Sequence, residues 1–336
     1  MATKIANTVQ ILDRRICVAP MMEWTDRHCR YLHRLYSPHA LLYTEMIVSA
    51  AIVRGKAQRL LAHDPEEHPV ALQLGGCDPH ELAQAARIGA AAGFAEINLN
   101  VGCPSDRVKS GSFGACLMLK PELVAECVGR MRDATPVPVT VKCRIGIDDR
   151  DDYEFFSSFV DAVADAGAAA LIVHARAAIL GGLTPKENRE VPPLKYHYVH
   201  RLKLERPRLA IVLNGGVADS AAALEALEAG LDGVMLGRAA YHRPALLAEL
   251  EQALVDPDWR IPQPWQIIER IMPYAHAQVR QGVPLHSITR HMHGLMAGRP
   301  GARAWRRFLS EVAARPDTPP EALFSALPLL NQGMAA

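Results

Sequence analysis

The 336-residue sequence predicts an α/β protein, a (β/α)8 TIM barrel followed by a C-terminal all-helical domain. Short apolar runs alternate with Ala- and Leu-rich amphipathic stretches from about residue 16 to about residue 240, and this alternation requires a mainly parallel sheet covered by helices. Eight such runs occur, which matches a fold that typically takes about 250 residues. Each run also ends in a polar or conformationally special residue, and packing alone does not explain that pattern.

The expected strands follow one another at regular spacing. They are 16–19, 41–44, 70–74, 96–100, 139–142, 171–174, 211–214 and 233–236. Helices are expected between several of them, at 79–92, 121–132, 153–166 and 220–229. Pro79 and Pro121 suit the first turn of a helix, whereas Asp78, and Asp219 or Ser220, suit an N-cap.

A doubly wound open sheet is the alternative architecture for the same alternation. That fold usually carries a GxGxxG turn after its first strand, where this chain has Pro20-Met21-Met22. The barrel is therefore the preferred prediction.

The strand–helix alternation stops after residue 243. Three Xaa-Pro pairs between 256 and 264 indicate a linker, and the sequence beyond them has helical patterns without strand candidates. We expect a catalytic barrel at 1–245 and a second, helical domain at 246–336.

Composition indicates an ordinary soluble protein, with 49% apolar and 22% charged residues and a formal net charge of +1 that points to no class of partner. The seven cysteines form no CxxC pair, which fits a reducing compartment. The first twenty residues contain several charges and no long apolar stretch, and no run reaches the roughly 18 apolar residues of a membrane span. We expect a cytoplasmic protein without membrane association and without a stable protein partner.

The turn Gly102-Cys103-Pro104-Ser105 follows directly after the expected strand 96–100. Gly102 and Pro104 restrict the backbone on either side of Cys103. A thiol at the carboxyl end of a barrel strand lies where such enzymes carry out their chemistry. Taken alone, the turn is equally compatible with Cys103 as a small buried apolar side chain.

Polar groups at the ends of neighbouring strands favour a cofactor site. Gln73 offers both a donor and an acceptor, Lys142 ends an apolar strand that gives a lysine no packing role, and His174 ends another. Asn214-Gly215-Gly216 and Gly237-Arg238 end the last two strands, where barrels commonly bind phosphate. One Gly-Gly pair is more often a tight turn, but two such sites in succession favour a phosphorylated cofactor. Together these groups suit flavin mononucleotide (FMN).

Several segments, in order and spacing, closely resemble the tRNA-dihydrouridine synthases from about residue 14 to about residue 315. They are Ala19-Pro20-Met21-Met22 with Thr25-Asp26-Arg27, 98–104, 140–144, His174-Ala175-Arg176, Asn214-Gly215-Gly216 and Gly237-Arg238. The segments 185–190 and 289–292 look like the A-type branch, whose members act on uridines 20 and 20a of the D-loop. The resemblance implies an FMN-containing barrel, a helical tRNA-binding domain and NADPH as reductant.

The resemblance also implies a role for individual residues. Cys103 matches the family's proton donor, and Asn100 matches a tRNA contact, to the substrate uracil or its nucleotide. The residues that match the flavin-ring site are Pro20, Met21, Met22, Gln73, Lys142 and His174. Those that match the phosphate site are Asn214, Gly215, Gly216, Gly237 and Arg238. Those that match tRNA contacts are Lys186, Arg189, Arg299 and Arg303.

The implied reaction reduces the C5–C6 bond of uridine to 5,6-dihydrouridine. Flavin N5 gives a hydride to C6 of the uracil, and the Cys103 thiol gives a proton to C5. Lys142 would stabilise negative charge on the reduced flavin.

A basic segment near the C-terminus supports an RNA partner. Five arginines and no acidic residue lie between Arg290 and Ser310, and Arg303, Arg306 and Arg307 share one helical face. His286, His291 and His293 have no carboxylate or cysteine close to them in sequence, so we expect no metal site there.

Two other functions remain open. A flavin barrel that acts on a free pyrimidine, like the dihydropyrimidine and dihydroorotate dehydrogenases, would need no arginine-rich helical tail. A tRNA-binding or folding protein with an idle barrel would not need the thiol of Cys103.

Overall fold

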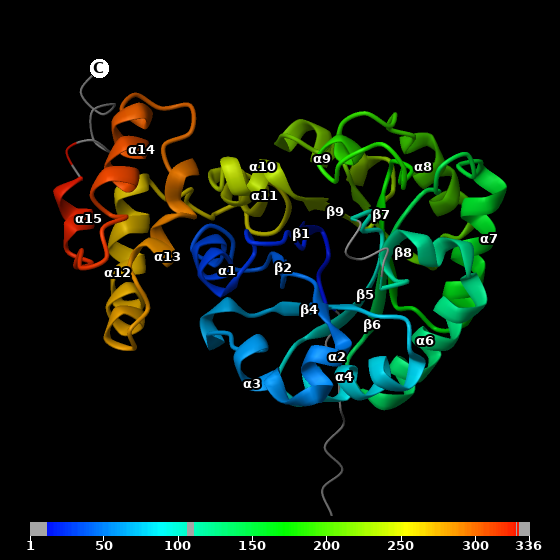
Figure 1. Ribbon diagram of the computed structural model, residues 1–336. Coiled ribbons are helices and arrows are strands. Elements are labelled where there is room, and N and C mark those ends of the chain that lie inside the picture. The colour runs from blue at the N-terminus through cyan, green and yellow to red at the C-terminus, as the bar shows by residue number, and fades with distance from the viewer. Residues whose placement is uncertain (1–11, 106–110, 327, 329–336) are drawn as a thin grey trace, which may run out of the picture.

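A closed barrel of eight parallel strands forms the body of the protein in the computed structural model, which describes residues 12–105, 111–326 and 328 (Figure 1). The strands are β1 (Ile16–Val18), β2 (Leu41–Tyr43), β4 (Val70–Gly75), β5 (Glu96–Val101), β6 (Val139–Arg144), β7 (Ala170–His174), β8 (Ala210–Asn214) and β9 (Gly233–Leu236). The two-residue β3 (Ile47–Val48) extends the pairing at the end of β4.

The pairing of β2 with β4 closes the sheet. Leu42 lies opposite Val70 and Tyr43 lies opposite Ala71, so both edges of the sheet are joined. An open, doubly wound sheet is thereby excluded, and the predicted barrel is confirmed. Each predicted strand overlaps an observed one, with ends that differ by at most two residues.

Helices cover the outside of the barrel. They are α1 (Arg27–Arg34), α2 (Ser49–Ala51), α3 (Ala57–Leu60), α4 (Pro79–Ala91), α6 (Pro121–Ala134), α7 (Tyr153–Asp165), α8 (Tyr196–Glu205), α9 (Ser220–Glu228), α10 (Arg238–His242) and α11 (Ala245–Leu254). Short helical turns cover Ile52–Lys56, Pro65–Glu67, Gly114–Leu119, Glu187–Arg189 and Met292–Gly294. The predicted caps are confirmed, because Asp78 accepts hydrogen bonds from the backbone of α4 and Asp219 from that of α9.

The inside of the barrel is divided between an apolar side and a polar side. The apolar side is a buried cluster of Cys17, Ala19, Leu41, Tyr43, Ala71, Ile172, Val212 and Met235. On β5 and β6 the inward positions are instead polar, and Glu96, Asn98 and Thr140 are fully buried. Ile97 and Leu99, the alternate residues of β5, belong to the main apolar core outside the barrel.

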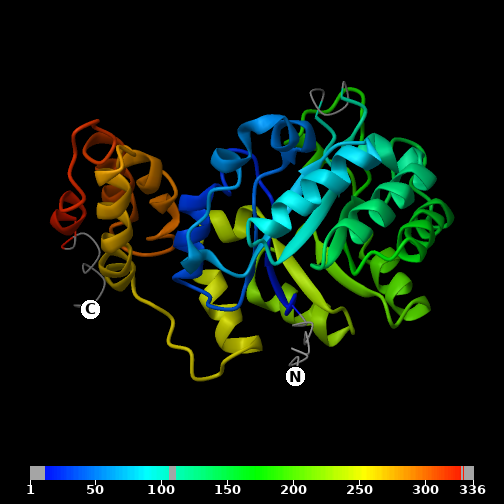
Figure 2. The same cartoon turned by 90° about the horizontal axis from the view of Figure 1, so that it is seen from below.

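A helical part follows the barrel and consists of α12 (Pro264–Arg280), α13 (His286–Thr289), α14 (Ala302–Glu311) and α15 (Ala322–Ser325). An extended segment, 255–263, joins it to α11, and the helical part lies beside the barrel (Figure 2). Trp305 of α14 is fully buried and donates a hydrogen bond from Nε1 to the Met292 carbonyl at 2.8 Å. Among the described residues, no helix combines the length and the apolar character needed to cross a bilayer.

Aromatic contacts hold the helical part against the barrel. Tyr31 of α1 stacks on Tyr274 of α12 with ring centroids 3.8 Å apart. The Tyr274 hydroxyl also lies 2.7 Å from His28 Nδ1, inside the interface. Trp24 stacks on Tyr241 of α10, whose hydroxyl lies 3.2 Å from Nδ1 of His291 in the helical part.

A charged contact at Asp26 reinforces this interface. Asp26 caps α1, lies 2.5 Å from Arg290 Nη2 and 3.0 Å from His291 Nε2. Burial alone would raise the pKa of Asp26, but His291, the backbone of α1 and Arg290 outweigh burial and hold that pKa well below its usual range. Asp26 is thus a carboxylate close to His291 in space, although none lies close to it in sequence. Within the described part of the chain, however, no group of three or more His, Cys, Asp or Glu side chains is placed to hold a metal.

Two buried histidines near this interface should make the fold acid-sensitive. Burial lowers the pKa of His33 to about 3 and that of His28 to about 4. Both bind a proton in the unfolded chain below about pH 6.5, so the free energy of unfolding should fall as the pH drops from about 6.5 toward 4. Replacing His33 with Gln should remove about 1.4 kcal/mol per pH unit from this slope.

Urea denaturation from pH 7.5 to pH 4 measures the slope. The difference in the free energy of unfolding between variant and wild type at pH 7.5 gives the packing cost of the substitution. The change in this difference with pH gives the contribution of proton binding to His33. Parallel curves over the whole range would contradict the assignment of His33.

Candidate active site

The carboxyl ends of five consecutive strands bring the expected polar residues together. They are Gln73 on β4, Asn100 on β5, Lys142 on β6, His174 on β7 and Asn214 on β8. Strand register places Asn100 opposite Lys142 and His174 opposite Asn214. Lys142 Nζ also donates to Asn214 Oδ1 at 2.9 Å, from β6 to β8. The structure thus gathers at one mouth residues that lie up to 141 positions apart in the sequence.

Asn100 and Arg144 fix the turn that carries Cys103. Asn100 Oδ1 accepts from the backbone N–H of Gly102 at 3.1 Å and from that of Cys103 at 3.0 Å. Arg144 Nε donates to the Gly102 carbonyl at 2.9 Å, and the Ala115 N–H donates to the Cys103 carbonyl at 2.9 Å. Cys103 itself is partly buried, so the turn is rigid while its thiol is not enclosed in the core.

Arg144 was a residue whose role the sequence did not reveal. It is buried, and its Nη1 donates to the carbonyls of Ala177 at 2.8 Å and Asn188 at 2.9 Å. It therefore ties the Cys103 turn to the loop after β7. Its position at the end of β6, two residues beyond Lys142, was the only signal in the sequence.

The mouth is electropositive. Burial and the Arg144 charge lower the pKa of Lys142 to about 8. Burial, followed by Arg144 and Lys142, holds the pKa of His174 well below its usual range, so its imidazole is neutral at pH 7. Arg176 and Arg189 act on His174 in the same direction. Such a concentration of cations favours an anionic ligand.

Two glycines follow β8 at positions that no larger residue could occupy. Gly215 has φ +96°, and a Cβ added there would lie 2.3 Å from His174 Cδ2. Gly216 has φ +76°, and its Cβ would lie 2.4 Å from the Tyr196 hydroxyl, which donates to the Gly215 carbonyl at 2.7 Å. Backbone without side chains can approach a phosphate closely.

The second glycine site lies beside the segment after β1. A Cβ on Gly237 would be 3.6 Å from Met21 Sδ. Pro20 and Met21 are half-buried there and Met22 is exposed. The next residue, Arg238, forms an ion pair with Glu190 from the loop after β7. Arg176, which the sequence analysis did not count among the site residues, has a buried Nε without a hydrogen-bond partner.

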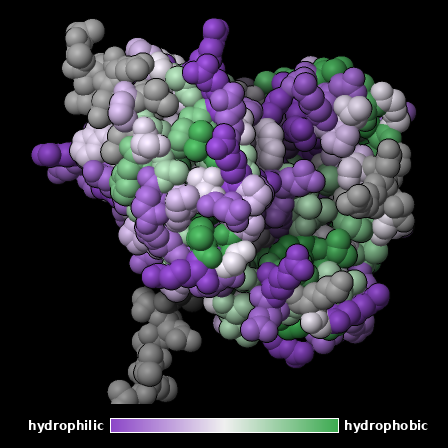
Figure 3. All heavy atoms as spheres, turned by 60° about the vertical axis from the view of Figure 1, so that its left-hand side comes forward, coloured by the Kyte–Doolittle hydropathy of each residue, from purple (hydrophilic) through white to green (hydrophobic). Residues whose placement is uncertain are grey.

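The residues expected to contact tRNA lie on the surface. Lys186 and Arg189 are exposed beside the mouth, at the short helix Glu187–Arg189. Arg303 is exposed on α14, and Arg299 is exposed and donates to Gln263 Oε1 at 2.7 Å. Hydrophilic side chains cover much of the helical part in the space-filling view (Figure 3).

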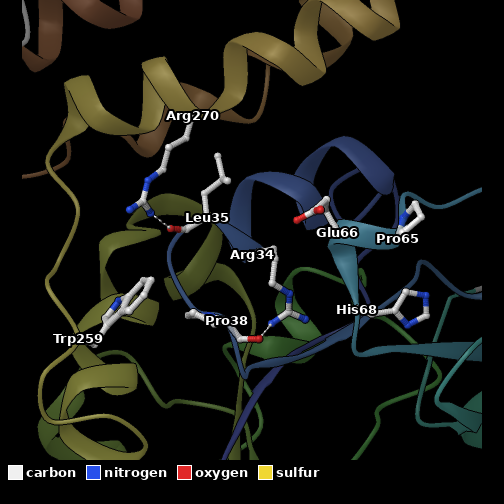
Figure 4. Close-up of a pocket in the computed structure, with 8 residues that line it drawn as sticks. All are labelled: Arg34, Leu35, Pro38, Pro65, Glu66, His68, Trp259 and Arg270. Carbon is white, nitrogen blue, oxygen red and sulfur yellow. Dashed lines mark hydrogen bonds between the residues drawn. The ribbon is translucent and has the colours of Figure 1, made fainter.

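A cavity of about 400 Å³ lies elsewhere, between the barrel and the helical part (Figure 4). Its lining residues are Arg34, Leu35, Pro38, Pro65, Glu66, His68, Trp259 and Arg270. His68 comes just before β4, so the cavity lies toward the amino ends of the strands, opposite the mouth. Arg34 is occupied by the backbone carbonyls of Ser37, Pro38, Glu67 and Pro69. This cavity is a seam between packed elements and contains none of the residues expected in the active site.

A closed parallel barrel with a thiol turn, buried cations and glycines at its carboxyl mouth is typical of TIM-barrel enzymes that bind an anionic ligand. The family model described as dihydrouridine synthase (Dus) matches residues 17–328. The chain belongs to the dihydrouridine synthase family, a family of flavin-dependent oxidoreductases.

Curated relatives match over almost the whole chain. A tRNA-dihydrouridine(20/20a) synthase of Xanthomonas campestris pv. campestris is 57% identical over 90% of this chain and 89% of that protein. Proteins of the same name from Yersinia pestis (52%, over 95% of this chain and 92% of that protein) and Vibrio cholerae (51%, over 93% and 95%) are also similar. Among solved structures, a 2-naphthoyl-CoA reductase in complex with 2-naphthoyl-CoA has a TM-score of 0.56 at 11% identity, covering 73% of this chain and 51% of that one; this likeness concerns the fold alone.

Gly215→Ala should lower the stability of the protein by more than the cost of placing an alanine in the left-handed backbone conformation. Gly230 offers a matched control, because its φ is +92° and a Cβ there would meet nothing within 4 Å. Both variants should lose about 1 kcal/mol of stability from the left-handed conformation, and Gly215→Ala should lose a further 1–3 kcal/mol, roughly, because its Cβ displaces His174. Urea denaturation measures both free energies of unfolding. If the two variants lost the same amount of stability, a Cβ at position 215 would not displace the His174 ring.

Proposed function

We propose that this chain reduces the C5–C6 bond of uridine to 5,6-dihydrouridine at positions 20 and 20a of the tRNA D-loop. The observation that carries the proposal is the Cys103 turn, a thiol held rigidly at the barrel mouth beside Lys142, in a chain that is 57% identical to a protein named for this reaction. We also propose that it acts in the cytoplasm, where tRNA is modified.

The donor set of the mouth fits FMN as cofactor, and we propose NADPH as its reductant from the resemblance to the family. Gly215, Gly216 and Gly237 expose backbone without side chains, which suits the close approach of a phosphate, and the unpartnered Nε of Arg176 can donate to it. Asn214 and Arg238 complete this side, provided that Arg238 turns from Glu190 to the phosphate. Gln73, Lys142 and neutral His174 provide the polar contacts to the flavin ring. The segment Pro20-Met21-Met22 lines the ring. When bound, FMN supplies the hydride that adds to C6 of the uracil.

Cys103 supplies the matching proton. Its thiol donates to C5 as C6 accepts the hydride, so the two additions together saturate the bond. The thiolate that remains lies near the positive charges of Lys142, Arg144 and Arg189, each of which interacts electrostatically with Cys103. Asn100 and Arg144 keep the turn in place during this transfer, because they hold its backbone rather than its sulfur.

The helical part supplies the tRNA-binding surface in this proposal. Within the described residues, Arg303, Arg306 and Arg307 of α14 take part in no ion pair, so their charges are available to phosphates. Arg299 and, at the barrel mouth, Lys186 and Arg189 extend the surface. Arg290 is committed to Asp26 instead. The boundary expected from the sequence, at 245/246, falls at the start of α11. Because α11 packs on β1 and α9, we propose that the division between the two domains lies after α11 instead, within 255–263.

Cys103→Ala should abolish the reaction. Removing a general acid typically costs a factor of about 10² to 10⁴ in rate. In cells that lack this gene, dihydrouridine at positions 20 and 20a should be lost, and wild type should restore it. The Cys77→Ala variant should restore it as well, because Cys77 is partly buried like Cys103 but has no role in the proposed reaction. Cys103→Ala should not. Position-resolved dihydrouridine analysis of tRNA decides this, and dihydrouridine that persisted without the gene, in the absence of a redundant enzyme, would refute the proposed reaction.

Arg303→Gln should weaken tRNA binding through loss of one phosphate contact. The slope of log K against log salt concentration should become shallower by about 1, while binding of all tRNAs weakens alike. Arg130→Gln, at an exposed position of α6, is the matched control and should leave the slope unchanged. An unchanged slope for Arg303→Gln, measured by titration at several salt concentrations, would remove Arg303 from the binding surface.

A further inference from the structure

A continuous chain of hydrogen-bonded side chains crosses the inside of the barrel and ends at the Cys103 turn. We call it the polar chain; its members, in order, are Arg14, Glu96, Thr140, Asn98, Gln73 and Asn100. Apart from Arg14, all are buried. The same barrel interior is filled elsewhere by Ile172, Val212 and Met235, so an apolar layer was sterically possible here. Buried polar groups cost free energy of desolvation, which calls for a reason to keep them.

Glu96 begins the polar chain near the amino ends of the strands. Arg14 donates to its Oε2 from Nε at 2.9 Å and from Nη2 at 2.6 Å. The hydroxyls of Tyr43 and Thr140 both lie 2.6 Å from Oε1. A carboxylate paired with a guanidinium can only accept, so both hydroxyls must donate to it.

The direction of every later hydrogen bond follows from this start. Thr140 has given its one proton to Glu96, so its oxygen accepts from Asn98 Nδ2, 2.9 Å away. Asn98 then presents Oδ1 to Gln73 Nε2 at 2.8 Å.

The second half of the chain continues in the same sense. Gln73 presents Oε1 to Asn100 Nδ2 at 2.8 Å, which leaves Asn100 Oδ1 for the backbone of the Cys103 turn. The N–H groups of Gly102 and Cys103 can only donate. Both ends of the chain are therefore fixed, and the three amides between them can satisfy all their neighbours in one orientation only.

We infer that Glu96 is a positioning residue, which acts through Thr140 and Asn98 to set the amide orientation of Gln73 and Asn100 and so holds the Cys103 turn ready for proton transfer. This rests on the proposed function only where it concerns Cys103 as the acid. Gln73 and Asn100 each keep one further N–H in a fixed direction for a ligand. A reversed chain would turn Asn100 Nδ2 toward the two N–H groups of the turn, donor against donor.

The test breaks the chain at Thr140. Thr140→Val keeps the shape of the side chain but removes the hydroxyl, whereas Thr140→Ser keeps the hydroxyl. Tyr43→Phe removes the other hydroxyl on the same Glu96 oxygen, which is a branch outside the path to Cys103. These two variants are the controls.

Hydrogen exchange at the Gly102 and Cys103 amides, resolved to single residues by mass spectrometry, is the first measurement. Thr140→Val should accelerate exchange on the order of tenfold, the effect of losing about one hydrogen bond. Thr140→Ser and Tyr43→Phe should stay within about twofold of wild type. With tRNA as substrate, kcat should fall on the order of tenfold for Thr140→Val while KM for tRNA is unchanged. If Thr140→Val and Thr140→Ser had the same exchange rates at these amides and the same kcat, the inference would be overturned.

Two further measurements keep the inference testable if Thr140→Val does not fold. Glu96→Gln can donate as well as accept, so it should also accelerate exchange at the turn. Neutron diffraction of the wild-type protein should show deuterium on Asn98 Nδ2 toward Thr140 and on Asn100 Nδ2 toward Gln73, and any reversed amide would refute the chain. Hydrogen exchange and neutron diffraction need neither cofactor nor tRNA. A wild-type protein that failed to reduce tRNA would therefore refute the proposed function, whereas these two measurements would still test the inference about Glu96.

Discussion

The pairing of β2 with β4 is the constraint on which the rest of the structure depends. Only a closed sheet points the carboxyl ends of all eight strands at one mouth, and there Gln73, Asn100, Lys142, His174 and Asn214 meet. Closure also creates an interior without access to water. Polar side chains placed inside must therefore satisfy one another, as those of β5 and β6 do.

The mouth concentrates positive charge. Lys142 and His174 each have a lowered pKa, since both are buried beside Arg144. Burying these groups next to one another is unfavourable, but it produces a site that favours an anion. The backbone at Gly215 and Gly216 carries no side chain and can therefore approach that anion closely. Charge and shape thus agree on the same kind of ligand.

Much of the fold could be predicted because its elements have strong local patterns. Short runs of four or five residues predicted the strands, and Asp78 and Pro79 predicted a helix start that the structure confirms. The mouth residues followed from their places at strand ends. Contacts between distant segments could not be predicted: Asp26 and Arg290 are 264 residues apart. The alternation of Asn98 and Asn100 with apolar residues also could not tell a barrel interior from a solvent-facing surface, since both allow polar side chains.

The close packing of the His174 ring on Gly215 limits which substitutions this sequence can accept during evolution. The His174 ring lies where a Cβ at 215 would be. A side chain at 215 would be admitted only after the ring had gone, and losing the ring first would leave a void beside Asn214 at the mouth. Neither position has a neutral first step, so descendants of this sequence should keep the pair or lose both together.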